Sequence, residues 1–278
     1  MTSGLVTPDA ADTAAGLRAW LQLLAASGVD QLIDDQPQPW ASRPAPQPKA
    51  PSGAGTTSPR PAPPARGRLV DDPAVASARN LASAAADLPA LLDAIAGFTL
   101  CPLQRTATQV CIADGDPRSP FMLVGEAPGA EEDREGKPFV GPSGRLLDRM
   151  LAAAGWPRPT TWITNTVYWR PPGNREPAAQ ELAMCLPFLE RQIELIRPKV
   201  VLFVGGIAAR ALLDQRDGVT KLRGRRFTYQ LPDGTAIPAR VMFHPAYLLR
   251  RPHLKGLAWR DLLATVALLE ETRAEEPA

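Results

Sequence analysis

The stretch Phe121-Met122-Leu123-Val124-Gly125-Glu126-Ala127-Pro128-Gly129 decides how the rest of the chain is interpreted. Phe121–Val124 is a short apolar run, which is typical of a buried strand. Residues 143–154 then carry apolar side chains at helical spacing. A strand therefore ends in a turn of Gly and Pro that carries Glu126. Ligands bind at this edge of an open parallel sheet, so the turn is a candidate site, although an ordinary strand-to-helix loop with solvated acids has the same pattern.

Strand and helix patterns alternate on both sides of this stretch. The predicted strands are Phe121–Val124, Thr161–Asn165, Lys199–Val204 and Arg240–Phe243, and the predicted helices are 143–154, 178–196, 206–214 and 255–271. A hairpin over Arg225–Tyr229 and Ala236–Val241, turning at Asp233-Gly234, should precede the last strand. Alternation of this kind predicts an α/β fold, a three-layer α/β/α sandwich around a mainly parallel four-stranded sheet.

The chain divides by composition into four parts. Residues 1–35 are predicted to form an N-terminal helical extension, because 9–33 carry an apolar stripe at helical spacing. Residues 36–70 are Pro/Ala-rich, with ten prolines between 36 and 68, and this composition predicts a disordered linker. The compact domain spans 71–272, opening with a helical segment at 74–97 that Pro89 breaks, and 273–278 is an acidic tail. The extension either packs back on the domain, binds a partner protein, or has no specific role.

Charge and cysteine content narrow the function classes. The 278 residues are 45% hydrophobic with a net charge of only +2. Residues 216–260, however, hold ten Lys and Arg against two Asp, a local charge of +8 that favours a polyanion such as nucleic acid or else a solvated basic face. Three cysteines make a disulfide framework improbable, and no apolar run has the ~20 residues of a membrane span. We expect a soluble, cytoplasmic monomer.

Polar or glycine residues stand where each predicted strand ends. Glu126, Asn165, Gly205-Gly206 and His244 follow the four strands in order. The ends of parallel strands meet at one edge, so one cleft should gather these groups. Singly they are weak signals, because such an Asn is often a cap and such a His structural. Gly205-Gly206 alone would indicate a nucleotide-binding regulatory module, but G-x-G-x-x-G is absent.

Taken together, the ordered segments form a recognisable set. They read GEAPGxxED, KPFVGPSG, TN, RPPGNR and HPAYLLR, with Arg-Pro-Lys before the third strand. This order resembles the uracil-DNA glycosylase superfamily, most closely family 4, over residues 98–268. The resemblance implies an enzyme of base excision repair that flips uracil out of DNA and hydrolyses its N-glycosidic bond, leaving an abasic site. The alternative is a DNA-damage-binding protein of the same fold without catalysis.

The resemblance also implies roles for five residues. Phe139 would stack on the flipped base, and the amide of Asn165 would read uracil's O4 and N3–H. His244 would donate to uracil O2, where negative charge grows as the bond breaks. Glu126 would orient water or stabilise the cationic sugar, and the turn that begins at Gly125 would contact the base or the water through its backbone N–H groups.

The resemblance further implies a surface that binds uracil-containing DNA, and the protein is therefore expected to associate with the nucleoid. Tyr247-Leu248-Leu249 would form a loop that wedges into the duplex, although some of these side chains could instead pack under the last helix. Phosphate contacts would come from basic residues on either side of the cleft. These are Arg170, Arg175, Arg250, Arg251 and Lys255.

The chain departs from family 4 at the cysteines that hold its iron–sulfur cluster. Of the four expected ligand positions, Cys101 and Cys185 match, whereas Gln104 and Trp169 replace the other two and Cys111 has an unrelated spacing. Because a cluster needs four such ligands, we expect no metal or cofactor, with Trp169 filling the space. A related branch captures uracil-DNA covalently through a His in an inserted loop near R-P-P. No such insertion interrupts 170–175, so turnover is expected.

Overall fold

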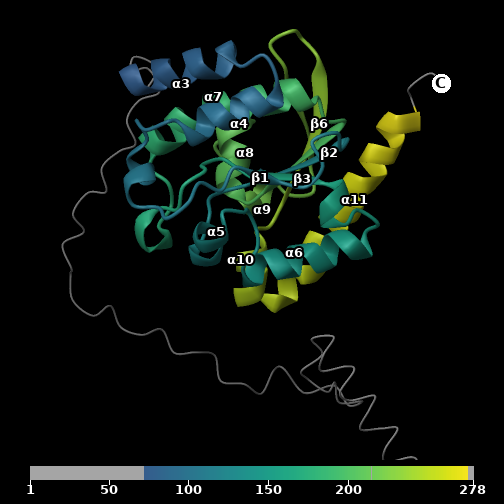
Figure 1. Ribbon diagram of the computed structural model, residues 1–278. Coiled ribbons are helices and arrows are strands. Elements are labelled where there is room, and N and C mark those ends of the chain that lie inside the picture. Colours follow the sequence, from purple (N-terminus) through teal and green to yellow (C-terminus); the bar gives the residue numbers. More distant parts are fainter. Residues whose placement is uncertain (1–71, 214, 275–278) are drawn as a thin grey trace, which may run out of the picture. The chain divides into compact units, whose positions relative to one another are not determined.

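The computed structural model describes residues 72–213 and 215–274, and these fold into layers of helices around one twisted sheet (Figure 1). The predicted extension at 1–35 and linker at 36–70 lie outside the described residues. Within the described part, every helix is too short or too polar to cross a membrane.

The sheet has six strands in the order β1-β3-β2-β4-β6-β5. The strands are β1 (Ala113–Asp114), β2 (Phe121–Gly125), β3 (Trp162–Asn165), β4 (Val200–Val204), β5 (Arg226–Gln230) and β6 (Ala236–Met242). The four central strands are parallel, which confirms the predicted α/β class and its parallel core. The predicted total of four was wrong, because β1 and β5 add antiparallel edges. Two residues are too few for β1 to show a period in sequence.

The hairpin and the last strand also differ from the prediction. β5 and β6 pair antiparallel as expected, from Gln230 opposite Ala236 to Arg226 opposite Arg240. The second arm of the hairpin is itself the last parallel strand, since β6 continues along β4 to Met242. The predicted hairpin arm at 236–241 and the predicted last strand at 240–243 are therefore one seven-residue strand, β6.

Helices cover both faces of the sheet. They are α3 (Pro73–Ala84), α4 (Leu88–Ala96), α5 (Ala130–Glu135), α6 (Pro142–Ala153), α7 (Ala179–Ile196), α8 (Gly206–Leu212), α9 (Val219–Leu222), α10 (Pro245–Arg250) and α11 (Lys255–Ala274). Figure 1 shows α6, α10 and α11 on one side of the sheet and α3, α4 and α7 on the other. The predicted break at Pro89 is confirmed, because α3 ends at Ala84 and α4 begins at Leu88, and Pro89 lies in the first turn of α4, where its missing N–H is tolerated.

The alternation of side chains along β2 explains the layering. Phe121 and Leu123 pack toward α6 and α11, whereas Met122 and Val124 pack toward α7 and α8. A further cluster joins α3, α4 and α7 to residues 167–169 that follow β3. The central strands are buried on both faces, so the polar groups at their carboxyl ends are held on a rigid frame.

Candidate functional site

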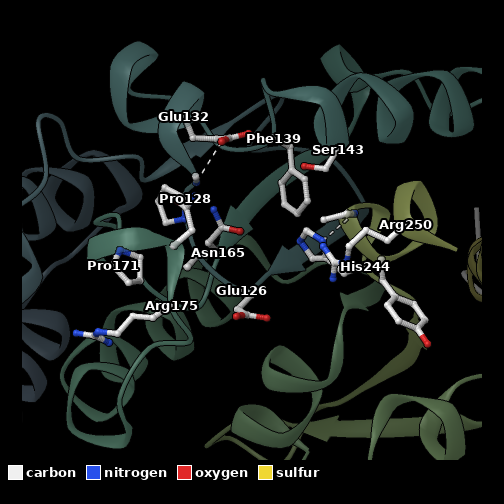
Figure 2. A pocket seen from close by; sticks show the side chains of 15 residues that line it. Glu126, Pro128, Glu132, Phe139, Ser143, Asn165, Pro171, Arg175, His244 and Arg250 are labelled. Atoms are coloured by element: carbon white, nitrogen blue, oxygen red, sulfur yellow. Dashed lines mark hydrogen bonds between the residues drawn. The ribbon is translucent and has the colours of Figure 1, made fainter.

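The carboxyl ends of the parallel strands open into one pocket of about 400 Å³. Its lining includes Glu126 after β2, Asn165 at the end of β3, His244 after β6, and Phe139 from the loop before α6. Figure 2 shows these side chains converging on the same space. The structure thus brings together four residues that the sequence had placed on four separate segments.

Asn165 is the most unusual group in the pocket. It is 1% exposed, and neither its amide oxygen nor its amide nitrogen has a hydrogen-bond partner within the described residues. Buried amides are nearly always paired, so an unpaired one facing a cavity is suited to a ligand. The strand register sets Asn165 opposite Gly125, where a Cβ would come within 2.3 Å of Asn165 Oδ1 and 2.4 Å of the Phe139 ring. Glycine at 125 is therefore required for the amide and the ring to lie side by side.

Glu132 joins two backbone segments that border the pocket, the turn at Gly129 and the loop at 138–141 that carries Phe139, called the pocket loop below. Its Oε2 accepts from the Gly129 N–H at 3.1 Å, and its Oε1 accepts from the N–H groups of Val140 and Gly141 at 3.0 and 2.9 Å. Glu131 to Asp133 lie in α5 and not in a loop, and Glu132 and Asp133 are buried. A glycine at the N-cap with Glu three residues later permits the half of a capping box in which the Glu side chain accepts the N-cap N–H, and this spacing was the overlooked signal.

His244 is held as a neutral imidazole with a defined tautomer. Its Nδ1 accepts the backbone N–H of Ala246 at 3.2 Å at the start of α10, so the ring proton resides on Nε2. Burial lowers the pKa of His244 to about 4, and the nearby positive charge of Arg250 acts in the same direction. Its ring stacks on Phe139, with centroids 5.5 Å apart and planes inclined by 27°. The pocket therefore contains a neutral N–H donor at neutral pH.

Glu126 is fixed through its backbone rather than its carboxylate. Its carbonyl oxygen accepts from Thr166 Oγ1 at 2.6 Å and from the Val167 N–H at 3.3 Å. Burial raises the pKa of the Glu126 carboxyl, the negative charge of Glu176 raises it further, and the positive charge of Arg210 opposes both. The carboxyl group lines the pocket, where it can face a sugar or a water molecule.

The segment after His244 corrects one predicted DNA contact. Residues 245–250 form the short helix α10 rather than a loop, and its periodicity turns Leu248 into the core, where it is fully buried. The assignment of Leu248 to the DNA-contacting surface is therefore wrong. Leu249 is 42% exposed and takes the outward position instead. Tyr247 is half-buried, packing on Phe243 with ring centroids 5.4 Å apart.

The predicted phosphate-contacting residues fall into two groups. Arg250, Arg251 and Lys255 are exposed, and Arg250 lines the pocket. Arg175 also lines the pocket, but its guanidinium forms a two-pronged ion pair with Glu181, at 2.8 and 2.6 Å. Arg170 donates through Nε to the side chain of Asn174 at 2.8 Å. Arg170 and Arg175, unlike the first group, therefore already have side-chain partners within the protein.

The basic run at 216–260 is not one free face. Arg223 pairs with the buried Asp261 at 2.7 Å, and Arg226 pairs with Glu271. These arginines tie α9 and β5 to α11, which the local charge count could not show because their acidic partners lie beyond residue 260. Exposed cations of the run remain on α10 and at the start of α11, and Arg250 is the one that lines the pocket.

The region of the expected cluster ligands is a packed apolar core. Cys101, Cys185 and Trp169 all lie in the cluster beneath α3, α4 and α7, and all are at most 2% exposed. Counted from Cys101, the C-x-x-C spacing reaches Gln104 in one direction and Phe98 in the other, and Phe98 is packed edge-on against Phe188 in the same cluster. Within the described residues, no three His, Cys, Asp or Glu side chains gather as potential metal ligands. The donors present do not fit a four-thiolate cluster.

Comparison with known proteins identifies the family. Residues 112–263, more than half of the chain, match the model of the uracil DNA glycosylase superfamily. The chain belongs to this superfamily. Its relatives include the type-4 uracil-DNA glycosylase of Pyrobaculum aerophilum, 36% identical over 180 residues, which cover 63% of this chain and 91% of the relative.

Two further type-4 uracil-DNA glycosylases are similar to this superfamily member. That of Thermotoga maritima is 41% identical over 153 residues, covering 55% of this chain and 78% of the relative. That of Archaeoglobus fulgidus is 36% identical over 159 residues, covering 56% and 79%. The superfamily match includes every pocket residue from Glu126 to Arg250, whereas Cys101 precedes it.

Proposed function

We propose that this chain is a uracil-DNA glycosylase that hydrolyses the bond between uracil and deoxyribose and leaves an abasic site, initiating base excision repair. The observation that carries the proposal is the unpaired, buried amide of Asn165 in the strand-end pocket. The amide offers both a donor and an acceptor, which complement O4 and N3–H of uracil. The type-4 uracil-DNA glycosylases among the relatives support the same substrate.

Base recognition would combine Asn165 with Phe139. The amide and the ring are neighbours across Gly125, so a planar base bonded to the amide would lie against the ring. A base inside a duplex cannot reach such a pocket, and the nucleotide must be flipped out of the stack. Leu249 and Tyr247, on the outer side of α10, would contact the opened duplex, and Leu249 replaces Leu248 in this proposal.

Bond cleavage would depend on His244 and Glu126. When the C1′–N1 bond breaks, the electron pair leaves with uracil and delocalises toward O2, while positive charge develops on the sugar. The Nε2–H of neutral His244 would stabilise the anion, and such a preorganised donor is worth about 3–4 kcal/mol. Water then adds to C1′, and the proton that it loses neutralises the released uracil anion, directly or through solvent. Glu126 would orient this water or stabilise the cationic sugar.

DNA binding would use exposed cations, of which Arg250 lines the pocket. Arg250, Arg251 and Lys255 can contact phosphates directly. Arg170 and Arg175 would do so only on exchanging or sharing their present partners, Asn174 and Glu181. Phosphate contacts release counterions, so binding should weaken steeply as the salt concentration rises.

We also propose that catalysis needs no iron–sulfur cluster. Phe98 and Trp169 fill the core around Cys101 and Cys185 with aromatic rings, which contribute burial in place of metal ligation. Protein purified without oxygen should contain less than stoichiometric iron and show no visible charge-transfer band. Stoichiometric iron in active protein would contradict this proposal.

An excision assay tests the glycosylase proposal. Oligonucleotides with U:A, U:G or single-stranded uracil are incubated with the protein and then treated with alkali, which cuts at abasic sites. We expect cutting at uracil with multiple turnovers, a loss of several orders of magnitude in Asn165→Ala, and near-normal activity in Arg118→Ala. Arg118 is an exposed arginine that pairs with Asp116 away from the pocket. Tight binding without cutting would instead support a damage-binding protein, and an adduct that survives denaturation would indicate covalent capture.

A further inference from the structure

The backbone of Phe139 adopts a conformation that bulky residues rarely occupy. Its φ is 55°, in the left-handed region, and its side chain is only 4% exposed. The ring stacks on His244 and lies beside Asn165 across Gly125. A non-glycine residue keeps such a conformation only where its surroundings enforce it, so other groups must hold this loop in place.

One guanidinium binds the loop at this point. Arg158 donates through Nη1 to the carbonyl oxygen of Pro138 at 3.1 Å and through Nη2 to that of Phe139. The first turn of α6 packs directly against the same carbonyl, because a Cβ at Gly144 would come within 1.8 Å of the Phe139 oxygen. On the other side, Glu132 binds the next two backbone N–H groups, so the peptide units on both sides of Phe139 are held.

Arg158 is itself fixed by two carboxylates from different elements. Its Nε donates to Asp148 in α6 at 2.8 Å, and its Nη1 also contacts Asp114 in β1 at 2.9 Å. Its side chain is only 18% exposed. With its donors bound on three sides, this guanidinium is suited to holding the loop rather than to contacting a DNA phosphate.

We propose that Arg158 is a positioning residue for base excision, acting through the ring of Phe139. It joins β1, α6 and the pocket loop, and so sets the ring against the place where a base would meet Asn165. The identity of that base rests on the proposed function. The link from Arg158 to the position of the ring does not.

A double-mutant cycle tests the catalytic part. Arg158→Ala should lower kcat/KM for uracil excision by about 10- to 100-fold, since displacements near 1 Å have effects of this size. In a Phe139→Ala background, the same substitution should change kcat/KM by less than about 3-fold, because the ring through which it acts is gone. Equal losses in both backgrounds would overturn the inference. Arg118→Ala, which removes an exposed arginine outside the pocket, should change neither value.

A spectroscopic measurement tests the positioning part without any substrate. The chain has seven phenylalanines, so labelling with 4-fluorophenylalanine gives seven ¹⁹F resonances, and Phe139→Leu identifies the one from 139. Arg158→Ala should shift or broaden this resonance, and Arg118→Ala should leave it unchanged. An unchanged resonance in Arg158→Ala would overturn the inference whether or not the protein excises uracil. A shifted resonance in a wild type that excises nothing would reject only the proposed function.

A milder variant is available if Arg158→Ala does not fold. Asp148→Asn keeps the size of the side chain but removes the charge that orients Arg158 from α6. It should move the same ¹⁹F resonance and lower kcat/KM by about 3- to 10-fold, again only where Phe139 is present. Wild-type values in both measurements would contradict the proposed role.

Discussion

Replacing Asn165 with Leu should stabilise the free protein while abolishing excision. The amide is 1% exposed, and neither of its polar atoms has a partner within the described residues. An unsatisfied buried polar group costs about 1–3 kcal/mol. Leu has nearly the same shape and no polar atoms, and water entering the pocket reduces the gain. We therefore expect about 1–2 kcal/mol, or about 2–8 °C in Tm for a domain of this size.

The assay is thermal and urea unfolding of both proteins, with excision measured in parallel. Thr164→Val is the matched control, because Thr164 is the preceding residue of the same strand and is also buried, but its hydroxyl donates to the Ile112 carbonyl at 2.6 Å. That substitution should lower the free energy of unfolding by about 1–2 kcal/mol, since it removes this partly buried hydrogen bond. If Asn165→Leu destabilised the protein as much as Thr164→Val does, the amide would have favourable contacts in the free state, and the reasoning would fail.

Three further predictions concern pH and packing. The pKa of His244 lies near 4 in the folded protein against about 6.5 in the unfolded chain, so the unfolded state binds a proton that the folded state does not. As the pH falls from 6.5 to 4, the free energy of unfolding of the wild type, measured in urea, should therefore fall by about 3 kcal/mol relative to that of His244→Asn. Glu176→Gln removes a charge that raises the pKa of Glu126, so the acidic limb of the kcat/KM profile should move to lower pH. Gly144→Ala, normally favourable in a helix, should destabilise the protein and lower excision at least about 10-fold, because the new Cβ would collide with the Phe139 carbonyl.

The sequence predicted the central sheet and the convergence of the site because both follow from simple periodicities. Continuous apolar runs identified the parallel strands, and the rule that parallel strands end at one edge brought Glu126, Asn165 and His244 together. The register was beyond such reasoning. Whether Asn165 pairs with Gly125 or with a neighbouring residue depends on packing across the sheet, and this pairing sets the amide beside the ring of Phe139.

The errors came from a segment too short to show its period and from ion pairs between residues distant in sequence. HPAYLLR contains too few residues to distinguish one helical turn and a half from a loop, so the inward direction of Leu248 was not predictable. The charge of the basic run was overestimated because Arg223 and Arg226 are paired with Asp261 and Glu271 on α11. A count of charges along the chain cannot include a partner that only the fold brings close.

The pocket contains three local arrangements that lower stability in the free protein. Asn165 has an amide without a partner among the described residues, Phe139 has a left-handed backbone, and His244 is neutral where it would be partly protonated in water. Local rules fail most often at functional sites, and the buried sheet supplies the stability that offsets them. The unpaired amide also bears on selectivity. A base that pairs with both amide atoms removes the free-energy cost of leaving them unpaired, whereas a base that pairs with neither does not. The difference in binding free energy between two such bases should therefore exceed that of two ordinary hydrogen bonds.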